Sequence, residues 1–521
     1  MKPTLSPSSE LLASLSVNET NLEPVLGSID STDRGPNGAR LTLFAGSSPT
    51  HRFAKLALLG IAVIGGLHFV SAVSAADPTS ATAATIAPVP SQKPVWLTDL
   101  SIGVKDSYDD NVFLSAVTPT SQVIPVGGVE ESKDRSSWVT TVSPKLGFDF
   151  ASLFGDPKTL QALTFGYAPD FVTYHNANTE SYDIQRFTTT VKGQVDDFSF
   201  NFDNGFSYID GSKYGPSYSA GLSAYATGTV RERREQYQDR STITVKFDQE
   251  NWFVRPTASL LYYNLETAQL TAAVSGPGYQ NYADRSDVNG GADFGYKLTK
   301  DLAVTLGYRD GRQFQQAYAA AIDPYQQSSS SDYQRVLLGF EGKVASWLDL
   351  KVQAGPDFRS YDKSAPVPDD KTTKYYGEAA VTATLSKQDT ISFNYRQWQW
   401  VSSTGKVPYF DSTFDLNYKH KFSDKLSGNL GARLLGSNYT SGLAAGAGST
   451  PDHIIGTTNT RNDLFYTLSA GVQYAFTANF SANLAYSYDL GRNGEDGLSA
   501  AVVAPRQFNR ALVSAGVAFK F

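Results

Sequence analysis

The chain has 521 residues, a formal net charge of −7, and only 18% charged residues against 41% apolar ones. A soluble chain of this length would form about three or four domains and carry about 25% charge, which is clearly more than this chain has. The absence of Cys excludes disulfide scaffolds, zinc clusters, iron–sulfur sites and Cys catalysis, and the acidic balance argues against a nucleic-acid partner. Only five His are present, so no enzyme activity, cofactor or metal is expected.

The first 95 residues contain three segments outside any folded body. Residues 1–50 are rich in Ser, Thr, Pro, Gly and Asn and lack periodicity, which predicts disorder. Residues 51–76 join a basic start to an apolar run that ends in small residues, with Val73 and Ala75 suitably spaced for cleavage, and they predict a signal peptide. Residues 77–95 form a Pro/Ala/Thr-rich linker.

Two alternatives remain open for this leader. The apolar run is long enough to act as an uncleaved membrane anchor. The extension ahead of the signal is either a mis-assigned start codon or a genuine extended N-terminal region. The folded body therefore begins near residue 96.

Residues 96–521 show apolar residues at every second position and no convincing helical period. In 302–308, 391–395 and 480–488, one face carries large apolar or aromatic side chains and the other carries small or polar ones. A period of two is typical of β-strands with one buried or lipid-facing side. The body is therefore predicted to be all-β.

The connections between these strands alternate in length. Short polar turns are predicted near 195–198, 248–252, 298–302, 345–348, 386–389, 422–426 and 476–480. Longer connections rich in Gly, Ser, Tyr and Ala are predicted at 211–234, 266–281, 315–331, 362–371, 440–460 and 491–506. Segments of about ten alternating residues with short periplasmic turns and long outer loops are typical of a transmembrane β-barrel, which must close because lipid cannot satisfy backbone groups. The strand starts predict a closed antiparallel barrel of about eighteen strands, with sixteen as the alternative.

The last segment, Arg510–Phe521, alternates and ends on an aromatic residue. It resembles the C-terminal signal by which the barrel assembly machinery recognises its substrates, with Phe521 as the terminal aromatic. Together with the signal peptide, this predicts a location in the bacterial outer membrane. The missing Cys also fits an oxidising envelope compartment.

The opening strand of the body carries a family resemblance. The segment Leu100–Leu114, with Tyr-Asp-Asp-Asn-Val-Phe at 108–113, resembles the first strand of the outer-membrane β-barrel porins sometimes called barrel porin type 2. The resemblance extends over the whole body, and its motif is short. It implies an outer-membrane barrel of poorly defined function, found at times near polysaccharide genes.

If the apolar positions face lipid, the pleat places the alternate positions in the lumen. The pore-lining candidates are Arg186, Lys192, Arg240, Arg255, Arg309, Arg335, Glu341, Arg396, Arg433, Asp349 and Asp415. Both signs of charge occur, which is compatible with a field that sorts solutes. A solvated polar wall, with charge pairs formed for stability, is the simpler alternative.

Aromatic residues gather near the strand ends. Interface girdles predict this, because an amphipathic ring suits the headgroup level. The candidates are Trp138, Tyr174, Tyr208, Trp252, Tyr282, Trp347, Tyr361, Trp398, Trp400, Tyr409 and Tyr439. The alternative is a sugar-stacking track in the lumen, for which Trp398 is suited because it shares a face with Arg396.

Catalytic and metal signals are weak. His420 is outward on its strand and its neighbour Ser423 lies in a turn, so no Ser–His pair is expected. Asp109, Asp110 and Asn111 offer oxygen ligands of the kind Ca²⁺ prefers, but a strand-end turn explains them equally well.

The sequence favours a porin-like channel for diffusion of small hydrophilic solutes, constricted by an inward loop at 211–234. That loop carries Arg231–Glu235, for which lipopolysaccharide phosphates are the alternative partner. The rival functions are an export or secretion barrel for polysaccharide and a structural or adhesive barrel plugged by its loops. Expected partners are outer-membrane lipids, lipopolysaccharide and the assembly machinery. A homo-trimer is compatible with this class but is not signalled.

Overall fold

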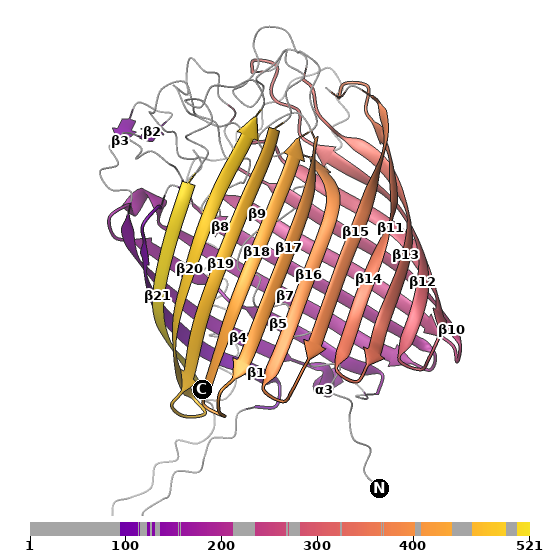
Figure 1. Ribbon diagram of the computed structural model, residues 1–521, viewed down its shortest axis with the longest axis horizontal. Coiled ribbons are helices and arrows are strands. Elements are labelled where there is room, and N and C mark those ends of the chain that lie inside the picture. The colour runs from indigo at the N-terminus through magenta and orange to yellow at the C-terminus, as the bar shows by residue number, and fades with distance from the viewer. Residues whose placement is uncertain are drawn as a thin grey trace, which may run out of the picture. The chain divides into compact units, whose positions relative to one another are not determined.

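The protein folds as a closed antiparallel β-barrel (Figure 1). The computed structural model describes residues 94–112, 114, 122–124, 128–130, 136–154, 156, 158–211, 235–266, 269, 282–322, 326–365, 367, 369–401, 408–439, 461–495 and 508–521. The disordered extension at 1–50, the signal peptide at 51–76 and almost all of the linker lie outside these residues. They stay predictions.

Nineteen strands form one sheet. The first half of the wall contains β1 (Leu97–Asp109), β4 (Ser137–Asp149), β5 (Leu160–Tyr167), β6 (Asp170–Tyr174), β7 (Tyr182–Val195), β8 (Phe198–Asp210), β9 (Gln236–Asp248), β10 (Trp252–Asn264), β11 (Arg285–Lys297) and β12 (Leu302–Gln315). The second half contains β13 (Ser331–Ala345), β14 (Leu348–Tyr361), β15 (Lys371–Thr384), β16 (Asp389–Val401), β17 (Pro408–Lys421), β18 (Leu426–Tyr439), β19 (Arg461–Ala475), β20 (Phe480–Glu495) and β21 (Phe508–Lys520).

The other described elements are small. A separate two-stranded sheet contains β2 (Gln122–Ile124) and β3 (Gly128–Glu130). The helix α3 (Ala151–Phe154) and the 3₁₀ turn η2 (Asn178–Glu180) are single turns beside the wall. Among the described residues, no helix combines the length and the apolar character needed to cross a membrane.

The wall has eighteen strand positions, because β5 and β6 share one place. Both pair with β4 on one side and with β7 on the other, and the strand is interrupted between them at Ala168 and Pro169. Pro has no backbone N–H to give to the ladder, which explains the break. The predicted count of eighteen is confirmed.

The barrel closes where the last strand meets the first. β21 pairs with β1 from Ser101 opposite Lys520 to Asp109 opposite Leu512. The Phe521 N–H donates to the carbonyl of Leu100 at 2.9 Å. The closed ladder leaves the wall without the open edge that a sheet in lipid would be unable to satisfy.

The short turns lie at one end of the barrel, which also holds the chain's C-terminus (Figure 1). We call it the short-turn end, and the opposite end the long-loop end. One of the two-residue turns joins β7 to β8 through Asp196 and Asp197, and Asp196 has a φ of 50°. Two-residue hairpin turns need positive φ to match the strand twist, and Asp tolerates that conformation.

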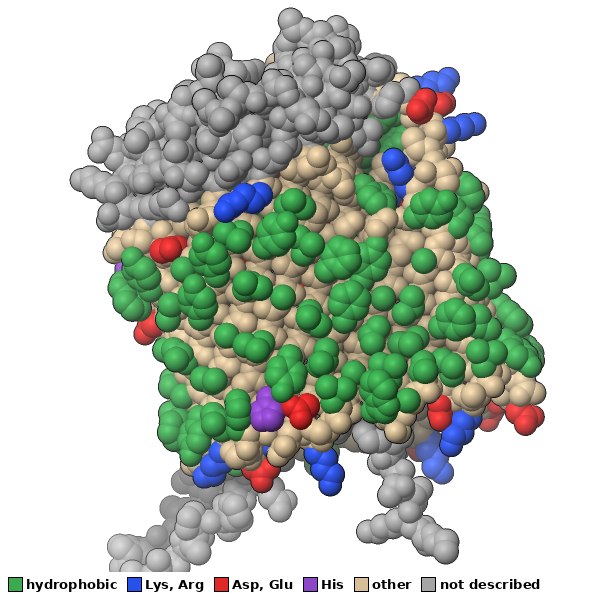
Figure 2. Space-filling model, viewed as in Figure 1, with side chains coloured by type: hydrophobic (Ala, Val, Ile, Leu, Met, Phe, Trp, Pro, Cys, Tyr) green, Lys and Arg blue, Asp and Glu red, His purple; other side chains and the backbone are tan. Residues whose placement is uncertain are grey.

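The outer face of the wall is apolar. On β19, Leu464, Tyr466 and Leu468 are exposed, whereas the alternate residues Thr467 and Ser469 face inward. Figure 2 shows apolar side chains over the middle of the wall, with charged groups mainly at its two edges. The prediction that alternate apolar side chains form the outer face of the wall is therefore confirmed.

Candidate functional site

The candidate site is the inner face of the barrel, and its first feature is a set of ion pairs. Arg255 reaches the Glu341 carboxylate with two hydrogen bonds of 2.8 Å and the Asp293 carboxylate at 3.0 Å. Arg309 approaches the other oxygen of Asp293 at 2.7 Å. The Asp293 side chain is only 4% exposed. The buried Asp293 carboxylate on β11 therefore links β10 and β12, the two strands that pair with β11.

A second network lies nearer the long-loop end. Asp357 is 2.7 Å from the Nε of Arg335 and 3.1 Å from Nη2 of Arg359. Arg359 also donates to Gln313 and to Ser331, and Tyr333 donates its hydroxyl proton to Asp287 at 2.8 Å. Buried charges persist when they are paired and hydrogen-bonded, and the Asp357 carboxylate accepts from both arginines. The network links β11, β12, β13 and β14 through their inward side chains.

The pairs continue elsewhere around the wall. Arg186 pairs with Asp170 at 2.6 Å, and Arg433 pairs with Asp415 at 2.9 Å. Near the long-loop end Arg510 holds Asp109 at 2.8 Å. Arg510 thus occupies the place that a cation would take at Asp109. Within the described residues, no cluster of three or more metal-ligating side chains occurs.

All eleven predicted pore-lining residues lie at strand positions that alternate with the exposed apolar ones, and so on the inner face. The structure brings together Arg255 with Glu341, and it pairs Arg335 with Asp357 rather than with another candidate. No described carboxylate lies within ion-pair distance of Lys192, and Asp349 likewise has no ion pair with a described cation. Whether these residues contact a solute stays a prediction.

The second feature is an inward bend of β16. Its ladder with β15 ends at Gly377 opposite Gln397, whereas β15 stays paired with β14 as far as Lys371. From Trp398 to Val401, β16 leaves its wall neighbour but remains paired with β17. The end of this hairpin therefore leans into the lumen.

Side chains of β11, β12 and β14 hold the end of this hairpin in place through hydrogen bonds. Gln313 of β12 donates to the Gln399 carbonyl at 2.9 Å, and Arg359 of β14 donates to the same oxygen at 3.3 Å. Arg285 of β11 donates to the Val401 carbonyl at 3.0 Å. Because these strands are two to five wall positions away from β16, contact with them requires the hairpin to cross part of the lumen.

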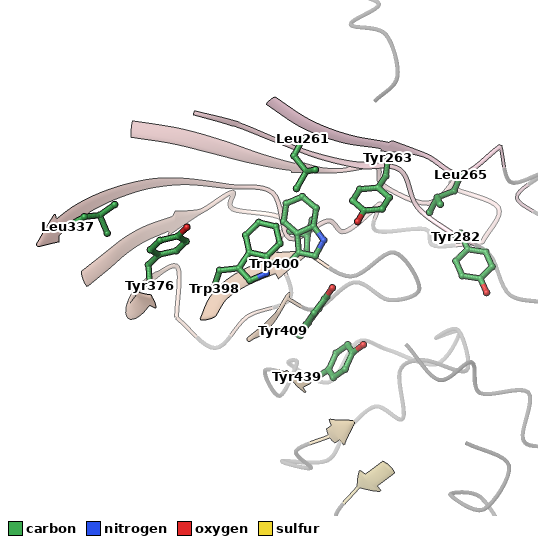
Figure 3. Packing of buried hydrophobic residues seen from close by; sticks show 11 residues of the cluster. Leu261, Tyr263, Leu265, Tyr282, Leu337, Tyr376, Trp398, Trp400, Tyr409 and Tyr439 are labelled. Carbon is green, nitrogen blue, oxygen red and sulfur yellow. The ribbon is translucent and has the colours of Figure 1, made fainter. Parts of the chain in front are cut away.

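An aromatic cluster fills the space beneath the bend (Figure 3). Trp398 and Trp400 stack with ring centroids 4.6 Å apart, and Tyr263 of β10 lies 6.0 Å from Trp400. The Arg285 guanidinium lies over the Tyr263 ring at 4.0 Å. Trp400 is 0% exposed. We call the wall from β10 to β16, with this cluster and the two networks, the crowded arc.

The girdle prediction is wrong for most of its residues. Trp138, Trp252 and Trp347 are exposed on the outer face as expected. Seven others are buried instead, because their strand positions face inward or lie in the cluster: Tyr174, Tyr282, Tyr361, Trp398, Trp400, Tyr409 and Tyr439. Nearness to a strand end does not tell whether a ring faces lipid, since both faces end at the same level.

The opposite part of the wall carries small inward side chains toward the short-turn end. On β18 to β21 the inward positions include Ser469, Gly471, Asn483, Ala485 and Gly516. Asn429 and Asn483 lean over Gly471 and Gly516, where even a Cβ would lie within 2.8 Å of the amide oxygen. We call β18–β21 together with β1 the small-residue arc. Small side chains reach only a short way inward, so this arc projects less side-chain volume into the lumen than the crowded arc does.

Sequence reasoning missed Arg285, Arg359 and Arg510. Arg359 could have been predicted, because it stands two residues after Asp357 and therefore lies on the same face of the strand. Arg285 and Arg510 stand near strand ends, where the pattern gives few clues to register. The predicted constriction at 211–234 falls almost wholly on residues 212–234, outside the described residues. The described constriction is the β16–β17 hairpin.

His420 lies on the outer face, as predicted, close to the short-turn end of β17. Its Nδ1 is 2.7 Å from Asp389, and Ser386 donates its hydroxyl proton to the other oxygen of that carboxylate at 2.6 Å. In the described part of the chain, no serine hydroxyl is bonded to His420. A Ser–His arrangement for nucleophilic catalysis is therefore not assembled among these residues.

These features define a porin-like β-barrel, with eighteen antiparallel strand positions, an apolar outer face and a charged inner face. No family model and no curated protein matches the sequence. Among solved structures, the chain resembles the outer membrane protein OpdK from Pseudomonas aeruginosa, with 9% identity over 81% of this chain and 99% of that one, and a TM-score of 0.36.

Two further solved structures are similar. OccK2 (OpdF) of Pseudomonas aeruginosa, in complex with glucuronate, shares 9% identity over 81% of this chain and 98% of its own, with a TM-score of 0.37. The siderophore receptor PirA from Acinetobacter baumannii shares 11% identity over 82% of this chain and 81% of its own, with a TM-score of 0.37. Likenesses at these scores do not identify a solute or an activity for this chain.

Proposed function

We propose that the protein is an outer-membrane channel through which small hydrophilic solutes diffuse. The observation that carries the proposal is the contrast on the inner face. The crowded arc is filled near the long-loop end by the aromatic cluster and its arginines, whereas the small-residue arc carries short, mainly polar side chains toward the short-turn end. The solute path then runs off-centre, beside β18–β21 and β1.

The membrane location rests on the outer face. Leu306, Leu338 and Leu468 are each more than half exposed and belong to different strands around the wall. An apolar surface over a whole barrel is costly in water and favourable in lipid. The short-turn end then faces the periplasm, and the exposed Phe521 beside it is available to the assembly machinery.

The rival functions fit less well. A polysaccharide export track needs free aromatic faces, but Trp398 is 6% exposed because it contacts both Trp400 and Arg396. The only observation in the described residues that favours a structural, plugged barrel is the filling of the crowded arc by the aromatic cluster. Binding to lipopolysaccharide and assembly as a homo-trimer remain part of the proposal without a described contact.

Purified protein in planar lipid bilayers tests the proposal. We expect stepwise single-channel currents. Replacing Ala485 by Trp places a bulky ring in the small-residue arc and should lower the conductance several-fold. Ala470 on the neighbouring strand faces outward, so Ala470→Trp is the matched control and should leave the conductance unchanged. The absence of any current would refute the channel and favour the plugged barrel.

A further inference from the structure

The wall of the barrel is split at its long-loop end, between β15 and β16. The ladder between these two strands stops at Gly377 opposite Gln397. Beyond that point β15 continues to Lys371 beside β14, and β16 continues to Val401 beside β17. Because β17 stays paired with β18 as far as Tyr409, the end of β16 turns inward together with its neighbour and not as a loose strand.

Each side of the split is a strand edge without a strand partner. Over Lys371–Tyr376, β15 is paired with β14 alone, and over Trp398–Val401, β16 is paired with β17 alone among the described strands. Backbone groups along such an edge favour pairing with another strand, and lipid offers them no substitute. The two edges belong to adjacent strands, so each is the nearest candidate partner of the other.

The register of the existing ladder predicts how the two edges would pair. Each step towards the N-terminus of β15 meets a step towards the C-terminus of β16. Tyr376 and Trp398, the first residues beyond the ladder, already belong to one buried cluster (Figure 3). Continued in this register, the ladder gains four pairs: Tyr376 with Trp398, Tyr375 with Gln399, Lys374 with Trp400, and Thr373 with Val401.

In the inward position that the structure shows, side chains from other wall strands bind the β16 edge in place of β15. The Gln399 carbonyl accepts hydrogen bonds from Gln313 at 2.9 Å and from Arg359 at 3.3 Å. The Val401 carbonyl accepts from Arg285 at 3.0 Å. These bonds give two backbone carbonyls of β16 a partner without β15, so they stabilise the inward position.

The inward position also leaves polar atoms of the same edge unsatisfied. Oε1 of Gln399 and Nε1 of Trp400 are buried without a hydrogen-bond partner in the described structure, which is destabilising. Return to β15 would give the edge backbone partners and bring the Trp400 ring to lumen water, but would lose the bonds to Gln313, Arg359 and Arg285. The two positions exchange one set of contacts for another, as a two-state element requires.

We propose that the β16 edge from Trp398 to Val401 is a gate with two positions. In the inward position it narrows the long-loop end of the lumen. In the second position, which we call the wall position, it pairs with β15 and the lumen is wider. This proposal rests on the channel function proposed above, but the movement itself can be measured without any current.

Engineered cysteines test the wall position, because the chain contains no Cys of its own. Tyr375→Cys with Gln399→Cys places two thiols opposite each other only when β16 is paired with β15. A disulfide needs Cβ atoms about 3.5–4.5 Å apart, close to the spacing of directly opposite residues in a ladder. The matched control is Ala379→Cys with Tyr395→Cys, an existing pair of the same ladder. The two pairs are four residues apart along each strand, so they have the same type of ladder position.

Both variants are oxidised in lipid vesicles, and the disulfide is read by mass spectrometry of proteolytic fragments. We expect a disulfide in both, and a higher single-channel conductance only in the Tyr375/Gln399 variant, reversed by reduction. A disulfide in the control alone overturns the gate, and so does a Tyr375/Gln399 disulfide that leaves the conductance unchanged. A disulfide in both variants without any current overturns the proposed channel, whereas the strand movement stands.

A second variant tests the inward position without cysteines. Gln313→Ala removes a donor to the Gln399 carbonyl, so it should favour the wall position and raise the mean conductance. Gln353→Ala is the control, because Gln353 donates to Glu378 on β15 and not to the β16 edge. Equal conductance of the two alanine variants would contradict the gate.

Discussion

The crowded arc and the small-residue arc belong to one sheet with one alternating pattern, yet their inner faces are opposite in character. On the crowded arc, long arginines and aromatic rings meet across several strands, as in the stack of Trp398 and Trp400. On the small-residue arc, the inward side chains of Ser469, Gly471 and Ala485 are too short to reach across the lumen. Side-chain size at inward positions therefore decides where the lumen is closed and where it stays open.

The difference also separates two uses of charge. In the crowded arc, charge is paired and buried, so it stabilises the wall. The small-residue arc also holds a buried pair, Arg510 with Asp109, but Lys105 on β1 and Lys419 on the adjacent β17 are exposed and have no described ion-pair partner. Four pairs of substitutions test these assignments.

The largest expected effect is on the aromatic cluster. Trp400→Ala removes a fully buried ring and should lower the free energy of unfolding by about 3–5 kcal/mol. The conductance should rise, because the hairpin loses its main contact. Trp400→Phe is the control. It keeps most of the side-chain volume, and the indole N–H has no partner in the described structure, so it should lower the free energy of unfolding much less. Urea unfolding followed by fluorescence, together with bilayer recording, measures both effects.

The next largest effect on stability is expected from removing the charge of Asp357, the central acid of the second network. Asp357→Asn leaves Arg335 and Arg359 buried without their shared anion, at a cost of about 3 kcal/mol. Asp203→Asn is the control, because Asp203 is exposed in the lumen and bonds to neutral partners. Equal midpoints of urea unfolding for the two variants would contradict the difference between the arcs.

Two neighbouring residues on β19 separate the lipid face from the lumen face. Leu468→Arg puts a charge on the outer wall and should cost about 2–4 kcal/mol if that position lies near the bilayer centre. Ser469→Arg puts the same charge into the lumen of the small-residue arc and should be tolerated. Folding into lipid vesicles, measured by heat-modified migration on gels, compares the two. A larger loss from Ser469→Arg would show that the faces are assigned the wrong way round.

The smallest effect concerns two glycines. Gly342 on β13 has a φ of +119°, and a Cβ there would lie 1.9 Å from the Asp301 carbonyl oxygen. Gly342→Ala should therefore cost at least about 1–2 kcal/mol. Gly103 on β1 has no neighbour nearer than 3.8 Å, so Gly103→Ala should change stability by about 0.5 kcal/mol or less. Chemical denaturation in detergent resolves this difference, and equal losses would contradict it.

Much of the fold could be predicted because a strand exposed to lipid on one side and water on the other must alternate. The period of two places β12 at Leu302 and β20 at Phe480, and the short polar turns locate the hairpins. The same alternation places Arg309 and Arg433 on the inner face. These are local properties, so the amino-acid sequence contains them directly.

The site was less predictable, because its contacts join strands far apart in the chain. Asp293 meets Arg255 and Arg309, and which of them it would pair with depends on ladder register. Trp398 and Trp400 were expected at an interface girdle, but β16 leaves β15 after Gln397 and carries both rings inward. A strand that stays in the wall and a strand that bends away from it show the same alternation, so the sequence does not reveal the bend.

The sequence by itself therefore determined the strands, the turns and the two faces of the wall, because each depends on residues within one hairpin. The tertiary structure decided which charges are paired, which lysines stay exposed, and that the hairpin of β16 and β17 narrows one side of the lumen. Those outcomes depend on how far a side chain or a strand end reaches across the closed barrel, and only closure of the barrel fixes that distance.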